Sequence, residues 1–365
     1  MRAQWIKSQS EFESISQKWD ELLVQTDPTN PFLSSHFILT WWKHYKDRYG
    51  IKILVLYEGY DLVAGLPLYE DCFSFPFQSI RFLYYLGGAV ANYTEPLVKG
   101  RRPDYLGALF QWLHTEKTWD ILHFKNVRHG HPLIEFSIKN SSSFVIQGHM
   151  NWAVDLSQGV DSYFKSRSKK LLKDLRSKRK QLIREYGAIS LLSISGEDKI
   201  KEHLKIYRDC SVQSFYSRAQ KNNFEDMLYF NFFQDFLILM EQKRKLRAYI
   251  LKAGAKILAL SFNLQLPNGF HWLLTGFNQE FHHFRPGYIL TEETIRMLEN
   301  EKQAYYNWYG HESFFKLQWC NKIEPLYRIK MVRKSLFNYG CHYAEELLRS
   351  NSVLKKWAKR LYGVS

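Results

Sequence analysis

The sequence predicts an α+β protein that contains two copies of one unit. Three pairs of segments, in the same order and at comparable spacing, carry this prediction. Residues 59–64 and 254–259 each begin with a glycine turn that enters an apolar run typical of a buried strand. Arg102-Pro103 and Arg285-Pro286 each precede a helical stretch, and aromatic strands are then expected at 119–124 and 305–309. Duplication explains this shared order better than chance.

The remaining elements follow the same plan in each half. In the first half we expect helices at 10–25 and 37–45, separated by a Pro-rich turn, and then strands at 52–57, 62–69 and 80–86. In the second half we expect helices between 200 and 240, strands at 246–252, 257–265 and 270–276, and a helix at 288–300. Helices followed by a β-meander differ from regular β-α-β alternation. Gly276 near a strand end indicates a bulge or a close approach to a ligand.

Composition limits the class of protein. The 365 residues suffice for two domains, and the formal net charge of +15 with a pI near 9.4 favours anionic partners. These include nucleic acid, lipid headgroups, phosphorylated cofactors and acidic carrier proteins. No stretch approaches the roughly 18 uncharged apolar residues of a membrane span, and the start lacks a signal-peptide core. We therefore expect a cytoplasmic protein.

Neither the cysteines nor the histidines indicate a metal site. The four cysteines lie far apart, which is typical of buried free thiols rather than of zinc ligands or a disulfide framework. His282 and His283 are adjacent, so their side chains point apart, and no third ligand is evident. We expect no metal.

The strongest charge feature is a predicted helix between 165 and 184 that is crowded with Lys and Arg. Its apolar stripe includes Leu171, Leu175 and Leu182. Two interpretations remain open: a solvated helix face that crosses between the halves, or a landing site for an anionic ligand. A second basic helix, at 341–362, would either dock on the body or touch a membrane surface.

One position separates the two copies chemically. Gly287, just before the predicted helix of the second copy, would let backbone N–H groups approach a phosphate, and the helix N-terminus adds partial positive charge. Arg285 adds a cation that can pair with phosphate. The first copy has Asp104 at the matching position, so we expect it to bind a pyrophosphate poorly. The alternative is that Pro286-Gly287 is an ordinary turn.

These motifs resemble the GNAT acyltransferase superfamily, in particular its CelD-like (cellulose biosynthesis-associated) branch, which is related to the FemAB-like double-GNAT proteins. The resemblance spans about residues 19–333. It rests on segments 31–35, 41–42, 167–180 and 285–290, and most specifically on 310–319, where an aromatic strand is followed by Gly310, a polar pair, aromatic residues, Lys316 and Trp319. One departure is Asn307-Trp308, where relatives often carry an acidic residue.

The resemblance implies tandem GNAT-like domains, each a mixed, mainly antiparallel sheet flanked by helices. We expect a degenerate first domain at 1–155, a basic linking helix at 156–190, an acyl-CoA-binding domain at 191–335 and an amphipathic helix at 336–365.

The resemblance also implies site residues. Acetyl-CoA, or another acyl-CoA, would be held by Leu274, Thr275, Gly276, Arg285, Pro286, Gly287 and Tyr288, with a backbone N–H of 274–276 donating to the thioester oxygen. His311 or Glu312 would be the general base, and Lys316 a cation near the acceptor. The alternatives are a strand cap for His311, a surface charge for Glu312, and an ion pair between Lys316 and Glu324. Expected acceptor contacts are Arg167, Lys170, Tyr216 and Trp319.

The resulting hypothesis is a transfer of an acyl group to an amine or hydroxyl of a sugar, polysaccharide or cell-envelope precursor. The protein would be cytoplasmic, with peripheral contact at the inner face of the membrane through the basic C-terminal helix as an additional partner interaction. Two rivals remain: a FemAB-like aminoacyltransferase that uses aminoacyl-tRNA, with the basic helix on RNA phosphates, and a non-catalytic scaffold of the same fold.

Overall fold

The computed structural model describes residues 1–333, apart from 75–78, 89, 217–221, 302 and 311, together with residue 340. The helix expected at 341–362 lies outside these residues. The chain divides into two compact units. Unit 1 contains Met1–Thr26, Lys46–Gly148 and the residues from Leu326 onward, and unit 2 contains Asp27–Tyr45 and His149–Pro325. The units therefore do not follow the expected boundaries, because each includes a segment from the other half of the chain.

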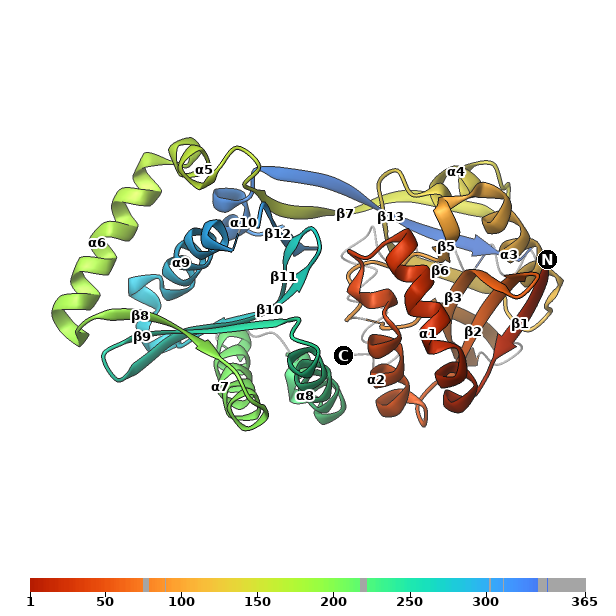
Figure 1. The fold of residues 1–365 in the computed structure, drawn as a ribbon, viewed down its shortest axis with the longest axis horizontal. Helices are drawn as coiled ribbons and strands as arrows, with labels where there is room; N and C mark the ends of the chain where they lie inside the picture. The colour runs from red at the N-terminus through yellow and green to blue at the C-terminus, as the bar shows by residue number, and fades with distance from the viewer. Residues whose placement is uncertain are drawn as a thin grey trace. The chain divides into compact units, whose positions relative to one another are not determined.

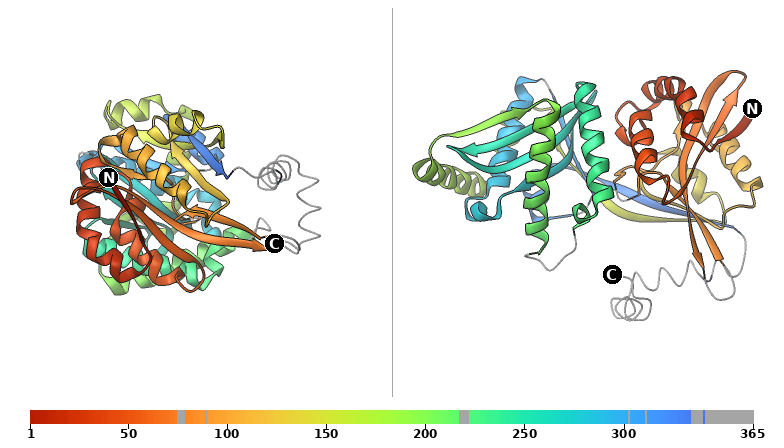
Figure 2. Two further views of the ribbon diagram at one scale, coloured as in Figure 1. Left: turned by 90° about the vertical axis from the view of Figure 1, so that its right-hand side faces the viewer. Right: turned by 90° about the horizontal axis from the view of Figure 1, so that it is seen from below.

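Unit 1 is a mainly antiparallel sheet with helices packed on it (Figures 1 and 2). The strand order is β1-β2-β3-β4-β6-β13, with β5 beside β3, and only the β4–β6 pair is parallel among the pairs whose register is resolved. Its elements are β1 (Arg2–Ile6), α1 (Gln9–Thr26), β2 (Gly50–Glu58), β3 (Asp61–Ser74), β4 (Ser79–Tyr85), β5 (Leu97–Val98), α3 (Pro103–Thr115), β6 (Ile121–Arg128), α4 (Pro132–Ile138) and parts of β7 (Ser143–Asp155) and β13 (Lys322–Val332).

Unit 2 has the strand order β7-β12-β11-β10-β9-β8, and its one resolved parallel pair is β11–β12. Helices α7 and α8 cover one side of its sheet, and α6 and α9 lie on the other (Figure 1). Its elements are α2 (Ser35–Tyr45), α5 (Val160–Ser166), α6 (Lys169–Tyr186), β8 (Ile189–Ile194), α7 (Glu197–Tyr216), α8 (Met227–Gln242), β9 (Leu246–Ala253), β10 (Lys256–Leu266), β11 (Gly269–Phe277), α9 (Pro286–Asn300), β12 (Tyr305–Tyr309) and α10 (Phe314–Trp319), with parts of β7 and β13.

The predicted duplication is confirmed by this order of elements. In each copy a first strand pairs antiparallel with a hairpin's first strand, as β1 does with β2 and β8 with β9. The two hairpin turns contain Gly59 and Gly254, with φ of 59° and 53°, which is the left-handed region that glycine adopts without strain. A helix with Pro at its first position, α3 or α9, then leads to one more strand, β6 or β12. This strand pairs parallel with the last strand of the meander, β4 or β11.

The strand that follows each copy pairs with the other copy. β7 follows the first copy in sequence, and its residues 152–155 pair with β12 in unit 2. β13 follows the second copy, and its residues 326–332 pair with β6 in unit 1. Helix α2 is exchanged in the same way, because Phe37 packs edge-on against Phe232 and Phe236 of α8. This exchange explains why the unit boundaries differ from the expected ones.

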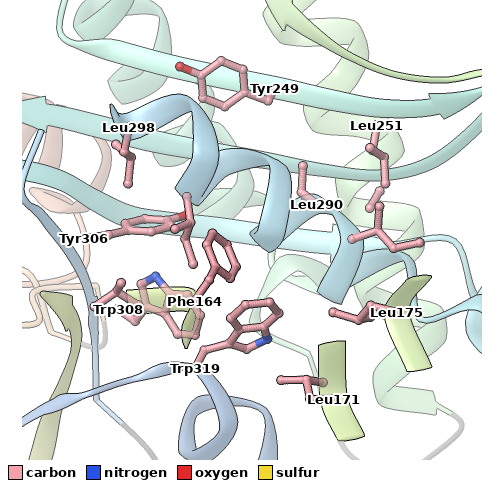
Figure 3. Close-up of a cluster of buried hydrophobic side chains, with 14 of the residues drawn as sticks. Phe164, Leu171, Leu175, Tyr249, Leu251, Leu290, Leu298, Tyr306, Trp308 and Trp319 are labelled. Carbon is pink, nitrogen blue, oxygen red and sulfur yellow. The ribbon is translucent and has the colours of Figure 1, made fainter. Parts of the chain in front are cut away.

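The basic helix α6 is an integral part of unit 2. Ser168 caps its start by accepting a hydrogen bond from the Leu171 amide, and Gly187 ends it with a φ of 93°. Leu171, Leu175 and Leu182 are buried in the unit 2 core with the aromatic residues Phe164, Tyr306, Trp308 and Trp319 (Figure 3). Helix α6 therefore contributes to a core on one side while most of its cations are exposed, and Arg179 instead pairs with Glu292 and Glu293 of α9.

Two other expectations are resolved by the fold. Cys210 and Cys320 are buried, as predicted, but Cys72 on β3 is exposed, so the expectation that the cysteines are buried is wrong for this residue. In the described part of the chain, the helices are all too short or too polar to cross a bilayer.

Candidate active site

Strands β11 and β12 meet only where they begin. Their parallel register comprises Phe270 opposite Tyr306 and His271 opposite Asn307, although β11 continues to Phe277. Leu274, Thr275 and Gly276 therefore lie where β11 has separated from β12 while it still pairs with β10. Backbone groups of β11 that face the separation have no ladder partner on β12 there, so they are available to a bound molecule.

Gly269 makes this geometry possible at the start of β11. A Cβ atom there would lie 2.0 Å from the carbonyl oxygen of Tyr305, and the φ of 139° is itself unfavourable for other residues. Gly276 faces α7 on the side where its Cβ would lie, and the expected approach of a ligand to its backbone stays a prediction. A Cβ on Gly276 would lie 3.0 Å from the Tyr207 ring of α7, so the close neighbour of Gly276 is a protein side chain.

The N-terminus of α9 presents backbone donors beside this separation. Pro286 is its first helical residue, and Arg285 precedes it in the left-handed conformation without capping the helix through its side chain. The amides of Tyr288 and Ile289 donate to the Arg285 carbonyl, whereas the Gly287 amide has no backbone acceptor among the described residues. Gly287 is half-buried, and a Cβ there would make only ordinary contact with Phe277. This arrangement suits an anion at Gly287.

Arg285 is held in place from the neighbouring helix. Its guanidinium forms an ion pair with Asp174 of α6 at 3.1 Å and lies 5.5 Å from the ring centre of Tyr288. The side chain remains 43% exposed, so it can still pair with a phosphate.

The first copy carries the predicted difference at the matching helix start. Arg102 precedes Pro103 in α3 as Arg285 precedes Pro286 in α9. The Asp104 carboxylate forms an ion pair with Arg102, which lowers the pKa of Asp104 through a side-chain hydrogen bond. In unit 1 an acid thus occupies the position of Gly287 and neutralises the adjacent cation.

Lys316 binds the backbone at the end of β12. Its Nζ donates to the carbonyl oxygens of Trp308 at 3.1 Å, Tyr309 at 2.7 Å and Gly310 at 2.9 Å. Burial lowers its pKa to about 8. Tyr309 adopts a left-handed φ of 54° at this point, so the ammonium group stabilises carbonyls where the backbone leaves the extended conformation. The suggested partner Glu324 instead lies 3.6 Å from Lys322.

This lowered pKa predicts a pH dependence of stability. Between about pH 8 and 10.5 the unfolded chain holds a proton on residue 316 that the folded protein has lost, so the free energy of unfolding should gain a positive slope with pH from this group. The Lys316→Met variant should lack this contribution. Urea denaturation of both proteins across this range measures it, and identical slopes would contradict the assignment.

The other expected site residues differ in burial, and two of them cannot be placed in the described part of the chain. Arg167 donates to the carbonyls of Trp319 at 3.1 Å and Cys320 at 3.2 Å, and thereby ties α5 to α10. Trp319 is fully buried, whereas Lys170 and Glu312 are exposed. His311 lies outside the described residues, as does the side chain of Tyr216 at the end of α7.

Sequence reasoning missed an aromatic wall beside Lys316. Trp272 of β11, Tyr288 of α9 and Phe315 of α10 are half-buried, and Phe315 stacks on buried Trp308 with ring centres 5.2 Å apart. The Phe315 ring also lies 4.8 Å from Tyr288 and 6.1 Å from Trp272. The wall spans three elements that are separate in sequence, and only the aromatic residues around Lys316 gave a signal for it.

A buried hydrogen-bonded pair supports the opposite side of β12. His271 Nδ1 and the Tyr309 hydroxyl are 2.6 Å apart, and His271 Nε2 lies 2.8 Å from Asn268 Oδ1. Because an amide oxygen only accepts, Nε2 is the donor, and Tyr309 then donates to Nδ1 in the neutral ring. No metal-binding group of three or more His, Cys, Asp or Glu residues occurs within the described part of the chain.

The duplicated mixed sheet flanked by helices is the fold class that the sequence predicted. Residues 169–317 match the family model described as an acetyltransferase (GNAT) domain, and this match supports an acyltransferase. The match contains α6 and most elements of the candidate site.

Comparison with solved structures gives the same fold at low sequence identity. FemX is 10% identical, with a TM-score of 0.61 over 91% of this chain and 98% of that chain. A conserved protein of unknown function from Bacteroides thetaiotaomicron VPI-5482 is 14% identical, with a TM-score of 0.56 over 91% of this chain and 100% of that chain. L-PGS from Bacillus licheniformis is 12% identical, with a TM-score of 0.53 over 92% and 97%. No curated protein matches the sequence.

Proposed function

We propose that this protein transfers an acyl group from acyl-CoA, specifically acetyl-CoA, to an amine or hydroxyl. The observation that carries the proposal is the separation of β11 from β12 beside the start of α9. A pyrophosphate would accept from the Gly287 amide and pair with Arg285, and Tyr288 would flank it. The thioester arm would run along Leu274, Thr275 and Gly276, whose edge on the β12 side is unpaired.

The chemistry of this transfer requires a hydrogen-bond donor to the thioester oxygen, a general base for the acceptor and a leaving group. The acceptor's amine or hydroxyl attacks the thioester carbonyl carbon, the C–S bond breaks, and CoA leaves as the thiol. A backbone N–H of 274–276 stabilises the oxyanion. We assign removal of the acceptor's proton to His311 or Glu312, which follow β12. Lys316 supplies positive charge and holds the carbonyls at the end of β12 in place.

The acceptor is proposed to be a sugar, polysaccharide or cell-envelope precursor, as in the CelD-like branch that the sequence resembles. Lys170 is exposed and can contact an anionic acceptor. Tyr216 is proposed as a second residue that contacts the acceptor. Arg167 and Trp319 would support the acceptor site without direct contact with the acceptor, because Arg167 binds backbone carbonyls and Trp319 is buried.

A second candidate function is aminoacyl transfer from aminoacyl-tRNA. The outward cations of α6 favour it, and FemX and L-PGS share the fold. Binding through several phosphates should weaken steeply between low and moderate salt, whereas acyl-CoA binding involves few phosphates and should change less. A non-catalytic scaffold would bind neither donor.

The Gly287→Asp substitution tests the proposed donor site, because it gives unit 2 the residue that unit 1 carries. Calorimetric titration should show acetyl-CoA binding to the wild type and at least about tenfold weaker binding to the variant, since the carboxylate repels phosphate and neutralises Arg285.

Two matched variants make the result specific. Gly287→Ala should retain most binding, because its Cβ fits 3.6 Å from Phe277. Asp104→Gly, the reverse change in unit 1, should leave binding unchanged. Absence of binding in the wild type would reject acetyl-CoA and direct the titration to longer acyl-CoAs and aminoacyl-tRNA.

A further inference from the structure

Helix α10 carries apolar side chains on its outer face. Phe314 is 71% exposed and Leu317 is 51% exposed, and they are three residues apart, which places them on the same side of the helix. The opposite side holds Phe315, Lys316 and Trp319, which pack toward the core or bind backbone. Such large exposed side chains next to one another are typical of a contact surface.

Uncompensated cations lie beside this apolar face. The two hydrogen bonds from Arg167 to the carbonyls that end α10 bring the α5–α6 junction against that helix. Lys165, Lys169, Lys170 and Lys173, at and after this junction, are exposed, and none forms an ion pair within the described residues. Farther along α6, Arg176 and Lys180 continue the row opposite the buried Leu171, Leu175 and Leu182.

Acidic residues in this region are few. Asp161 of α5 and Glu312 before α10 are exposed, Asp174 pairs with Arg285, and Glu324 pairs with Lys322. Ile323, just after α10, adds a third apolar side chain that is 45% exposed. The surface therefore combines protruding apolar groups with a flanking row of cations.

We propose that α10 and the α5–α6 junction form a surface that binds an anionic phospholipid membrane. Phe314 and Leu317 enter the boundary between headgroups and acyl chains, and the lysines contact the anionic headgroups. The exposed aliphatic side chains distinguish this partner from nucleic acid, because an RNA backbone would use the cations but has no place for Leu317 or Ile323. Binding in this way would bring Lys316, on the same short helix, close to the bilayer surface.

Vesicle sedimentation with the full chain tests this surface. Vesicles of phosphatidylcholine mixed with phosphatidylglycerol should sediment the wild type, and vesicles of phosphatidylcholine alone should do so far less. The double substitution F314S/L317S should weaken binding roughly tenfold or more, because it removes both apolar anchors. The triple substitution K165E/K169E/K170E should weaken binding to the anionic vesicles similarly, and added salt should weaken the wild type.

Matched variants elsewhere control for general changes of surface. Ile138→Ser removes an apolar side chain that is 68% exposed on α4, and K199E/K205E reverses two exposed lysines on α7. Both should bind vesicles as the wild type does. The proposal is overturned if the wild type fails to sediment with anionic vesicles, or if F314S/L317S binds them unchanged. Unchanged vesicle binding by the F314S/L317S variant, together with tight binding of the wild type to duplex RNA, would assign the cations to nucleic acid.

Discussion

Replacing Gly269 with alanine is expected to destabilise unit 2 by about 3 to 5 kcal/mol. The new Cβ would lie 2.0 Å from the Tyr305 carbonyl oxygen, so the backbone of β11 or β12 must move, and the φ of 139° adds strain of its own. This is the point at which the two strands pair before they separate. Urea denaturation followed by tryptophan fluorescence measures the loss, and acyl-CoA binding should weaken with it.

A second glycine separates the clash from the strain. Gly159, at the start of α5, has a φ of 84° with nothing within 4 Å of the Cβ position. Gly159→Ala should therefore cost only the backbone strain, about 1 to 3 kcal/mol. Equal losses in the two variants would show that backbone strain alone matters and that the contact with Tyr305 does not fix the strand separation.

Lys316→Met is expected to lower kcat by about a hundredfold with little change in KM for acyl-CoA. Methionine retains an unbranched apolar stem but removes the ammonium group that binds three carbonyl oxygens and supplies charge beside the site. Release of CoA thiol, measured with an acceptor found by screening, reports the rate.

Lys316→Arg is the informative companion. A guanidinium keeps the charge but does not titrate in the accessible range, so any dependence of rate on an ionisation near pH 8 should disappear while part of the activity remains. If Lys316→Met kept wild-type kcat, Lys316 would be only a structural clamp and its proposed part in the reaction would be withdrawn.

Local sequence was enough to predict several parts of this fold. The turns at Gly59 and Gly254 need a left-handed residue, Pro103 and Pro286 fit the first position of a helix, and the α6 leucines repeat at helical spacing. Each of these signals depends on the conformation of a few neighbouring residues. The contrast between Asp104 and Gly287 could be predicted for the same reason.

Other features depend on residues that are distant in sequence. The exchange of α2, β7 and β13 between the units had no signal, because an apolar strand or helix does not encode which copy will cover it. Strands β1, β7, β8 and β13 were not predicted either.

The sequence by itself determined the duplicated order of helices and strands and the helix start that distinguishes the second copy. The tertiary structure decided that Lys316 binds backbone carbonyls rather than Glu324, that Tyr207 lies against Gly276, and that Phe314 and Leu317 stay exposed. Backbone conformation is local, so a sequence can specify it directly. Burial and hydrogen-bond partners depend on how separate elements pack, and these are settled only in the folded chain.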